Sequence, residues 1–199
     1  MSTVYGIRVD HKIGDRDSAF ARYTDNNVSS VSATSHLPIA TVGSMKIDPQ
    51  SGFAGLAPQI ARNAQVNYAH TLTPQLLFTL GAGYLYVNNQ SQSLNYGMNP
   101  NTAFGQANLN IDQSTSGLAY ATVTGATNLG NGGYFVPLME KDNVYQLSSA
   151  VMYSVGRHSL KGGGTLIAVT LLCCRTMRVR ETGHSPRACR AWSVASIPT

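Results

Sequence analysis

The sequence predicts an all-β protein: an antiparallel meander of about six strands, an incomplete piece of a transmembrane β-barrel, with two long loops and an irregular C-terminal tail. Three observations predict it. Several segments alternate between apolar and polar side chains, short and long connections alternate along the chain, and only 12% of the residues are charged, about half the usual fraction. Asn, Gln, Ser, Thr, Gly and Tyr fill the difference, and these residues suit strands and loops better than helices.

The first two strands form a hairpin. Residues 4–13 alternate between apolar side chains such as Ile7 and charged ones such as Arg8, which is the period of a strand with two different faces. Their number matches the roughly 9 to 11 residues that a tilted strand needs to cross a bilayer. Residues 14–17 supply a polar turn, and residues 18–24 resume the alternation, as in a β-hairpin.

Four further strands repeat the same pattern. A proline turn separates the first two of them, since proline cannot donate a hydrogen bond within a central strand. The predicted strands are residues 63–68, residues 76–86, residues 143–154 and a strand that opens at residue 159.

The lengths of the connections also follow a rule. Residues 14–17, 72–74 and 156–158 are short turns, whereas residues 25–59 and 88–138 are long segments rich in Asn, Ser and Gly. In an antiparallel meander every short turn then lies at one end and every long loop at the other, as in outer-membrane β-barrels. The tyrosines near strand ends suit the aromatic girdles of such barrels: Tyr5, Tyr23, Tyr84, Tyr86 and Tyr153.

A soluble antiparallel sheet with one face on a core would give the same alternation. The strand lengths, the asymmetry of the loops and the charged and amide-rich polar face favour the barrel. The alternative function is therefore a soluble or surface-exposed β-rich binding module, such as an adhesin or lectin-like domain.

Three segments also resemble one family in the same order. YGIRVDHKIGDRDSAFARYT at residues 5–24 resembles the first barrel hairpin of TonB-dependent outer-membrane receptors of the Oar-like type. NAQVNYAHTLTPQLLFTLGAGYLY at residues 63–86 and NVYQLSSAVMYSVGRHSLKGGG at residues 143–164 are similar to two later hairpins of that family. The resemblance covers residues 4–164.

The resemblance implies a barrel of some 22 strands around an N-terminal plug, which binds an external ligand and imports it across the outer membrane with energy delivered by TonB. The expected partners are outer-membrane lipid, the remainder of the barrel, the plug and TonB. This sequence shows no signal peptide, TonB box or plug. An open sheet leaves unpaired edge groups that lipid does not tolerate, so we expect a fragment that does not function alone.

The end of the chain has a different composition. Residues 1–160 hold eight basic and eight acidic residues, so the net charge of +5 comes from the last 39 residues, which also hold all three cysteines. We therefore expect two parts: a partial barrel at residues 1–164 and an out-of-pattern, poorly ordered tail at residues 165–199. Our hypothesis is that the tail is translated out of frame.

The tail offers weak candidates for binding. Cys173, Cys174, His184 and Cys189 could hold zinc, but adjacent cysteines lack the spacing of structural zinc sites. The tail arginines could attract phosphate without specificity, although solvated arginines explain them better: Arg175, Arg178, Arg180, Arg187 and Arg190.

No catalytic pattern is present upstream. Asp10 and His11 point to opposite faces of one strand, and the glycine-containing segments at residues 81–83 and 130–133 match no phosphate-binding loop. We expect no enzyme, cofactor, metal site or nucleic-acid partner, and the pattern identifies no ligand-binding residue.

Overall fold

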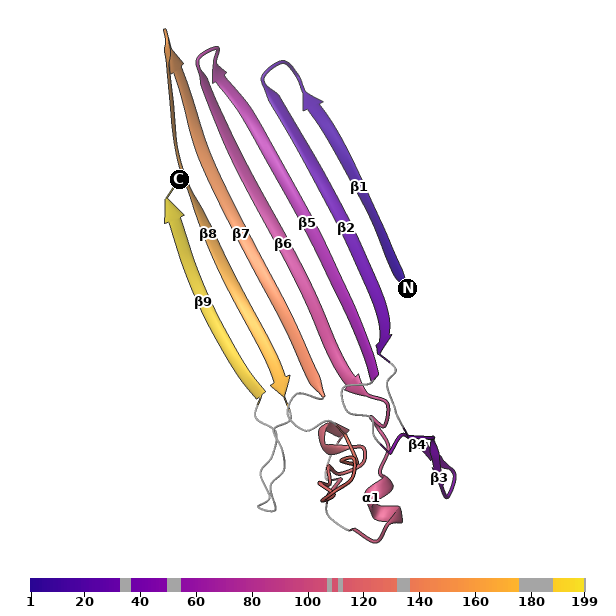
Figure 1. Cartoon of the computed structure of the whole chain (residues 1–199). Coiled ribbons are helices and arrows are strands. Elements are labelled where there is room, and N and C mark those ends of the chain that lie inside the picture. The colour runs from indigo at the N-terminus through magenta and orange to yellow at the C-terminus, as the bar shows by residue number, and fades with distance from the viewer. Residues whose placement is uncertain are drawn as a thin grey trace.

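A computed structural model describes residues 1–32, 37–49, 55–106, 109–110, 113–131, 137–175 and 188–198. Its main feature is one antiparallel sheet of seven strands in the order β1-β2-β5-β6-β7-β8-β9 (Figure 1). The strands of this sheet are β1 (Ser2–Ile13), β2 (Asp17–Ser32), β5 (Gly55–Thr73), β6 (Leu76–Ser93), β7 (Leu138–Val155), β8 (His158–Arg175) and β9 (Ala188–Pro198). The strands of this sheet follow one another in chain order and are antiparallel throughout, which confirms the predicted fold class.

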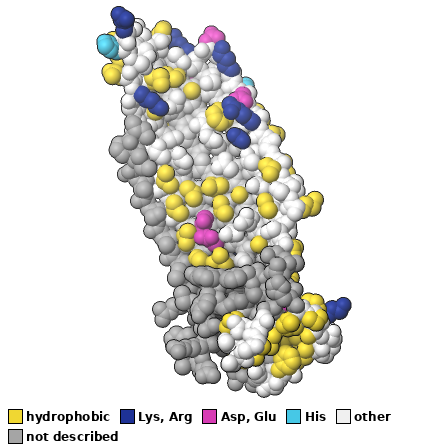
Figure 2. All heavy atoms as spheres, in the orientation of Figure 1, with side chains coloured by type: hydrophobic (Ala, Val, Ile, Leu, Met, Phe, Trp, Pro, Cys, Tyr) yellow, Lys and Arg dark blue, Asp and Glu magenta, His cyan; other side chains and the backbone are white. Residues whose placement is uncertain are grey.

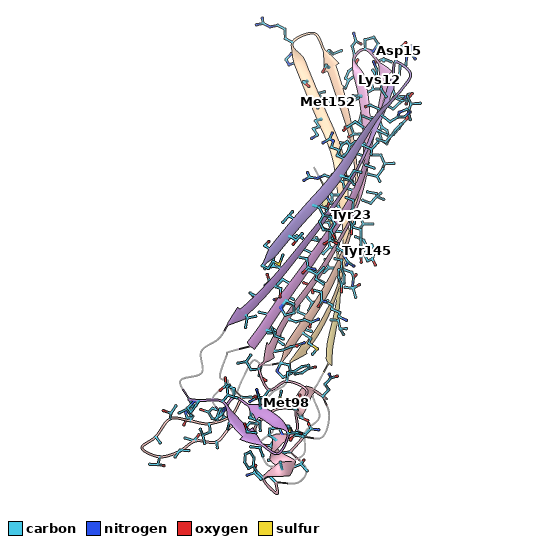
Figure 3. The ribbon with its side chains drawn as sticks, turned by 90° about the vertical axis from the view of Figure 1, so that its right-hand side faces the viewer. Lys12, Asp15, Tyr23, Met98, Tyr145 and Met152 are labelled. Carbon is cyan, nitrogen blue, oxygen red and sulfur yellow. The ribbon has the colours of Figure 1, made fainter. Side chains whose placement is uncertain are left out.

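The sheet is open. Strands β1 and β9 lie at its two edges and do not pair with each other (Figure 1). Figure 3 shows the sheet as a strongly twisted ribbon, as expected from the right-handed twist of strands. The six predicted strands correspond to β1, β2, β5, β6, β7 and β8, and β9 is a seventh that the sequence pattern did not predict.

The irregular tail predicted after residue 164 is wrong for the part of the tail that the structure describes. Strand β8 continues through residue 164 to Arg175, and every residue of β8 has a partner in β7. Thr165, Ile167 and Val169 are β-branched, and such residues favour strands whether or not polar residues alternate with them. The change in alternation marks a strand with apolar residues on both faces, and it does not mark the end of the sheet.

The first predicted long loop is shorter than expected at both ends, and the second is shorter at its start. Strand β2 extends to Ser32 and strand β5 starts at Gly55, so the ladder includes many of the polar residues predicted as loop. Main-chain hydrogen bonds hold such residues in the sheet whatever their side chains. The first connection contains the small hairpin of β3 (Ala40–Val42) and β4 (Met45–Ile47), and the second contains α1 (Pro100–Ala103) and the short 3-10 helix η1 (Gln113–Thr115).

The two ends of the sheet differ as predicted. The turns β1–β2, β5–β6 and β7–β8 lie at one end, here termed the turn end, and both long connections lie at the other, the loop end (Figure 1). Gly14 and Gly156 occupy two of the turns with φ of 69° and 58°. This backbone conformation favours glycine because it has no Cβ.

The most buried residues lie in the connections. Ile47, Asp48, Asn95 and Asn101 are each no more than 2% exposed, and all four belong to the loop end. None of the helices in the described residues has the length and apolar character required to cross a membrane.

Candidate functional site

The register of the sheet defines two faces. The outer face carries the odd-numbered residues of β1, β2 and β7 and the even-numbered residues of β5, β6 and β8, because residues paired across strands point to the same side. The inner face carries the remaining residues of these six strands. The two faces have different chemistry, and this difference is the main functional feature of the described structure.

The outer face exposes large apolar side chains across its width. Val9, Val66 and Leu147 are 59%, 55% and 50% exposed. A contiguous apolar surface of this kind marks a protein or membrane contact. Further exposed members of the outer face are Tyr5, Ile7, Ile13, Tyr23, Val31, Leu56, Leu72, Leu80, Tyr145, Val151, Tyr153, Val155, Leu160 and Leu166.

A polar cluster interrupts this apolar surface on β2 and β5 toward the loop end, and Val31 and Leu56 lie beyond it. The Arg62 Nε atom lies 2.9 Å from the Asp25 Oδ2 atom, and the Tyr23 hydroxyl donates to the same oxygen at 3.3 Å. The Asp25 side chain is only 7% exposed, whereas that of Arg62 is 51% exposed. We term Tyr23, Asp25 and Arg62 the loop-side cluster.

A second polar cluster interrupts the apolar surface toward the turn end, and Leu72 lies beyond it. The Tyr68 hydroxyl donates a hydrogen bond to Asp17, and the Nδ1 atom of His70 lies 2.5 Å from Asp17 Oδ1. Asp17 and His70 are direct partners across β2 and β5, as Asp25 and Arg62 are. We term Asp17, Tyr68 and His70 the turn-side cluster.

The separation of the two clusters matches a bilayer. Eight residues separate Arg62 from His70 along β5, which at about 3.4 Å per residue is about 27 Å along the strand. With a barrel-strand tilt of about 40°, this gives about 21 Å across the membrane, close to the roughly 25 Å apolar band of outer-membrane barrels. We therefore expect the apolar side chains between the clusters, such as Val66, to face lipid.

Tyrosines accompany this band as predicted. The register places Tyr5, Tyr23, Tyr84, Tyr86 and Tyr153 together on the outer face. Tyr84 packs against Tyr145 with ring centroids 5.1 Å apart, and its hydroxyl donates to Asn143 Oδ1 at 2.7 Å. Figure 3 shows Tyr23 and Tyr145 on one side of the sheet. Each ring thus combines an apolar body with a polar end, which suits a membrane interface.

The inner face is polar and charged near the turn end (Figure 2). Arg8 forms a bidentate pair with Asp10, with Nη2–Oδ1 and Nε–Oδ2 distances of 2.6 and 2.8 Å. The Arg8 guanidinium also lies 4.1 Å from the ring centre of Phe20. Asp10 is on the inner face and His11 is on the outer face, so the structure agrees that these neighbours form no dyad.

The two long connections pack together at the loop end through asparagine side chains. The Asp48 main-chain N–H donates to Asn95 Oδ1 at 2.9 Å, and Asn95 Nδ2 donates to the Asp48 carbonyl at 2.7 Å. Asn101 likewise donates to the Gly117 carbonyl and accepts from the Ala119 N–H. The amides replace a hydrophobic core here, because they satisfy main-chain groups that the loops cannot pair themselves. The sequence predicted loops at these positions but did not show that they pack together.

The cysteine candidates do not assemble into a described metal site. Cys173 and Cys174 lie near the end of β8, and Cys173 is the register partner of Cys189 in β9. His184 lies outside the described residues. Among the residues that the structure describes, no group of three or more potential ligands could hold a metal ion.

The tail arginines fall partly outside the structure. Arg175 ends β8 and Arg190 lies in β9. Arg178, Arg180 and Arg187 lie outside the described residues.

The comparisons with known proteins agree with the geometry of the sheet. Residues 2–172 match the family model described as outer membrane beta barrel domain. The match begins in β1 and ends within β8, past the boundary predicted at residue 164. Neither a curated protein nor a solved structure matches the chain. The match covers most of the sequence, and the strands of the sheet have the apolar and polar faces of a barrel wall. The chain belongs to the outer membrane beta barrel domain family.

Proposed function

We propose that this chain forms a sector of the barrel wall of a TonB-dependent receptor of the Oar-like type. In the intact receptor it takes part in ligand binding and energised uptake across the outer membrane, and it carries out no reaction of its own. The finer assignment rests on the resemblance of the hairpins at residues 5–24, 63–86 and 143–164 to that family.

The observation that carries the proposal is the pair of open edges on a sheet whose outer face is apolar. Strands β1 and β9 each present one side without a partner strand in the described sheet. Lipid cannot satisfy main-chain N–H and C=O groups, so a sheet in the membrane has to close into a barrel. The proposal therefore includes the remainder of the barrel as the partner of both edges.

The loop end supplies the proposed ligand-facing surface. Long loops of outer-membrane barrels lie outside the cell. Here Asn95 joins the second connection to Asp48 of the first, and Asn101 braces the second connection internally. Phe104 and Tyr120 are exposed in the second connection. An ordered, partly aromatic surface suits recognition of an external ligand.

The first experiment tests the membrane assignment. The purified chain should need detergent to stay in solution and should enter phosphatidylcholine vesicles, where protease digestion leaves the strands protected. A soluble monomer with a cooperative thermal transition in plain buffer would contradict the proposal. It would favour the alternative, a soluble β-rich binding module.

The second experiment tests dependence on TonB. The intact protein encoded around this chain should bind the purified periplasmic domain of TonB, and a variant without its TonB-contacting segment should not. If the intact protein inserts into vesicles but binds no TonB, the barrel assignment stands and the receptor type is refuted.

The reading frame of the gene gives an independent test of the tail. We predict that translation of the DNA beyond the Gly164 codon in another frame yields further two-faced strands. Frames that both lack such a pattern would show that residues 165–199 are the genuine continuation. The pairing of β8 beyond residue 164 does not decide whether the tail is translated in the correct frame. β-Branched residues favour strands in either case, so only the DNA sequence tests the hypothesis.

A further inference from the structure

A groove lies on the inner face over the middle of β5, β6 and β7. Its volume is about 200 Å³, and no charged residue is among the described residues that line it. Its wall combines amide and hydroxyl side chains with apolar ones such as Leu85 and Val144. We term the set of Asn63, Gln65, Asn67, Gln146 and Ser148, with Gly81 and Gly83 between them, the amide groove.

Two glycines in the central strand create the hollow. Gly83 lies between its register partners Gln65 and Gln146, and a Cβ atom built on Gly83 would have no neighbour closer than 3.9 Å. At Gly81 a Cβ atom would lie 2.6 Å from Asn67 Oδ1 and 2.8 Å from Ser148 Oγ. Asn67 and Ser148 therefore cover Gly81, whereas the space over Gly83 is open.

The amides of this groove are not paired with one another. The structure shows no side-chain hydrogen bond for Asn63, Gln65 or Gln146 to any described residue, and the Nδ2 atom of Asn67 is buried without a partner there. Some amides elsewhere in the same sheet do pair, as between Gln59 and Asn89 at 3.0 Å, whereas Asn26 Oδ1 in β2 is also buried without a described partner.

The unpaired amides of the groove affect the free energy of the protein. A buried donor without a partner is unfavourable, and Asn67 Nδ2 is such a donor. The side chains of Gln65 and Gln146 also lack a described protein partner and are not buried, so a molecule in the groove can reach them. The absence of charge in the wall favours an uncharged molecule.

The spacing of the amides selects the class of molecule. Asn63, Gln65 and Asn67 follow one another at two-residue intervals on β5, which is about 6.8 Å in a strand. An extended peptide has the same two-residue repeat, so its main-chain amides would meet successive side chains in phase. The loop end already shows such a contact, because Asn95 binds both the N–H and the C=O of Asp48.

We propose that the amide groove binds an extended, uncharged peptide segment with small side chains, which lies along β5 and β6 with its main chain held by Gln65 and Gln146. The small volume accommodates a short part of the segment, because pockets for whole drug-sized ligands are larger, about 300 to 1,000 Å³. The inference deepens the proposed function, on which it rests, since it assigns a ligand class to the lumen side of the barrel wall. The segment could be a free peptide in transit or part of the receptor polypeptide itself.

The experiment is a titration of the full chain in detergent micelles with a blocked hexapeptide of alternating glycine and serine. The side-chain amide resonances of Gln65 and Gln146 should shift and saturate. Gln65→Leu and Gln146→Leu should each weaken binding roughly threefold to tenfold, as expected for one lost hydrogen bond. Gly83→Val should abolish the shifts because it fills the hollow.

The matched control is Gly162→Val. Gly162 is on the outer face, and a Cβ atom there would also meet nothing within 4 Å, so the same substitution leaves the groove open and peptide binding should persist. Equal losses in both valine variants, no saturable shift in the unmodified chain, or binding of maltohexaose in place of the peptide would each overturn the proposal.

A further arm separates the two sources of the peptide. Binding to the isolated chain and also to the intact receptor indicates a free peptide, and binding to the isolated chain alone indicates that a receptor segment already fills the groove. Insertion of the same sample into vesicles tests the proposed function separately. A chain that inserts but does not bind the peptide refutes the inference and leaves the barrel assignment in place.

Discussion

A single charge placed on the outer face gives the sharpest test of the membrane orientation. Val66 lies on β5 midway between Arg62 and His70, four residues from each, so its depth is about 10 Å from either polar cluster at a strand tilt of about 40°. This is the middle of the predicted bilayer. We predict that Val66→Arg strongly destabilises the inserted protein.

The magnitude follows from the position. An arginine that faces lipid at the bilayer midplane costs about 2 to 4 kcal/mol, which is roughly a 30-fold to 900-fold change in the folding equilibrium constant. On a sheet in water, the same change at a side chain that is 55% exposed would alter the free energy of unfolding by about 0.5 kcal/mol or less. The two interpretations of the outer face therefore differ by several-fold in a measurable quantity.

The assay is urea unfolding of the chain reconstituted in phosphatidylcholine vesicles, followed by the fluorescence of Trp192, the single tryptophan. The matched control is Gln65→Arg, since Gln65 is the preceding residue, lies on the inner face and faces the open space over Gly83. We expect a large loss for Val66→Arg and a small one for the control. Equal losses, or a loss below about 0.5 kcal/mol at Val66, would refute a lipid-facing outer face.

Three further sets of substitutions test the loop-side cluster, the loops and the inner wall. Arg62→Met should destabilise the protein by about 1 to 3 kcal/mol, because it leaves the buried Asp25 carboxylate without its positive partner. The double variant with Asp25→Asn should recover most of this loss in a urea double-mutant cycle, and additive losses would show that the pair is not coupled. Asn95→Ala should lower the free energy of unfolding by about 1 to 3 kcal/mol, because main-chain groups of the first loop lose their partner. Limited trypsin digestion should then cleave that loop faster, and an unchanged rate would contradict the proposed role of Asn95. Gly81→Ala should lower the melting temperature through a Cβ atom 2.6 Å from a side-chain oxygen, whereas Gly83→Ala should leave it nearly unchanged, and equal effects would contradict the described packing.

The strands could be predicted because the two faces of a barrel wall have different surroundings, which gives alternating apolar and polar residues along the sequence. Residues such as Ile7 and Arg8 alternate because one face meets lipid and the other does not, and this pattern predicted β1, β2, β5, β6 and β7 within their observed bounds. The ends of the strands were harder to predict from the sequence. Asn27 and Asn89 look like loop residues, yet the ladder includes them because sheet pairing depends on main-chain groups.

In the tail, the sequence pattern led to a wrong prediction of where the sheet ends. Residues 165–175 lack alternation, and the sequence therefore predicted the end of the sheet. The structure continues β8 through them, because β-branched residues such as Ile167 and Val169 are good strand formers and β7 offers an edge to pair with.

The sequence by itself determined the class of this protein, the number of its early strands, the end at which its turns lie and the identity of its two faces. These are local properties, since period and turn composition are set by neighbours along the chain. Only the tertiary structure decided which residues meet across strands: Asp25 with Arg62, Asn95 with the peptide of Asp48, and the amides on either side of Gly83. Such contacts depend on register between segments tens of residues apart, and a shift of one residue would move each of them to the other face.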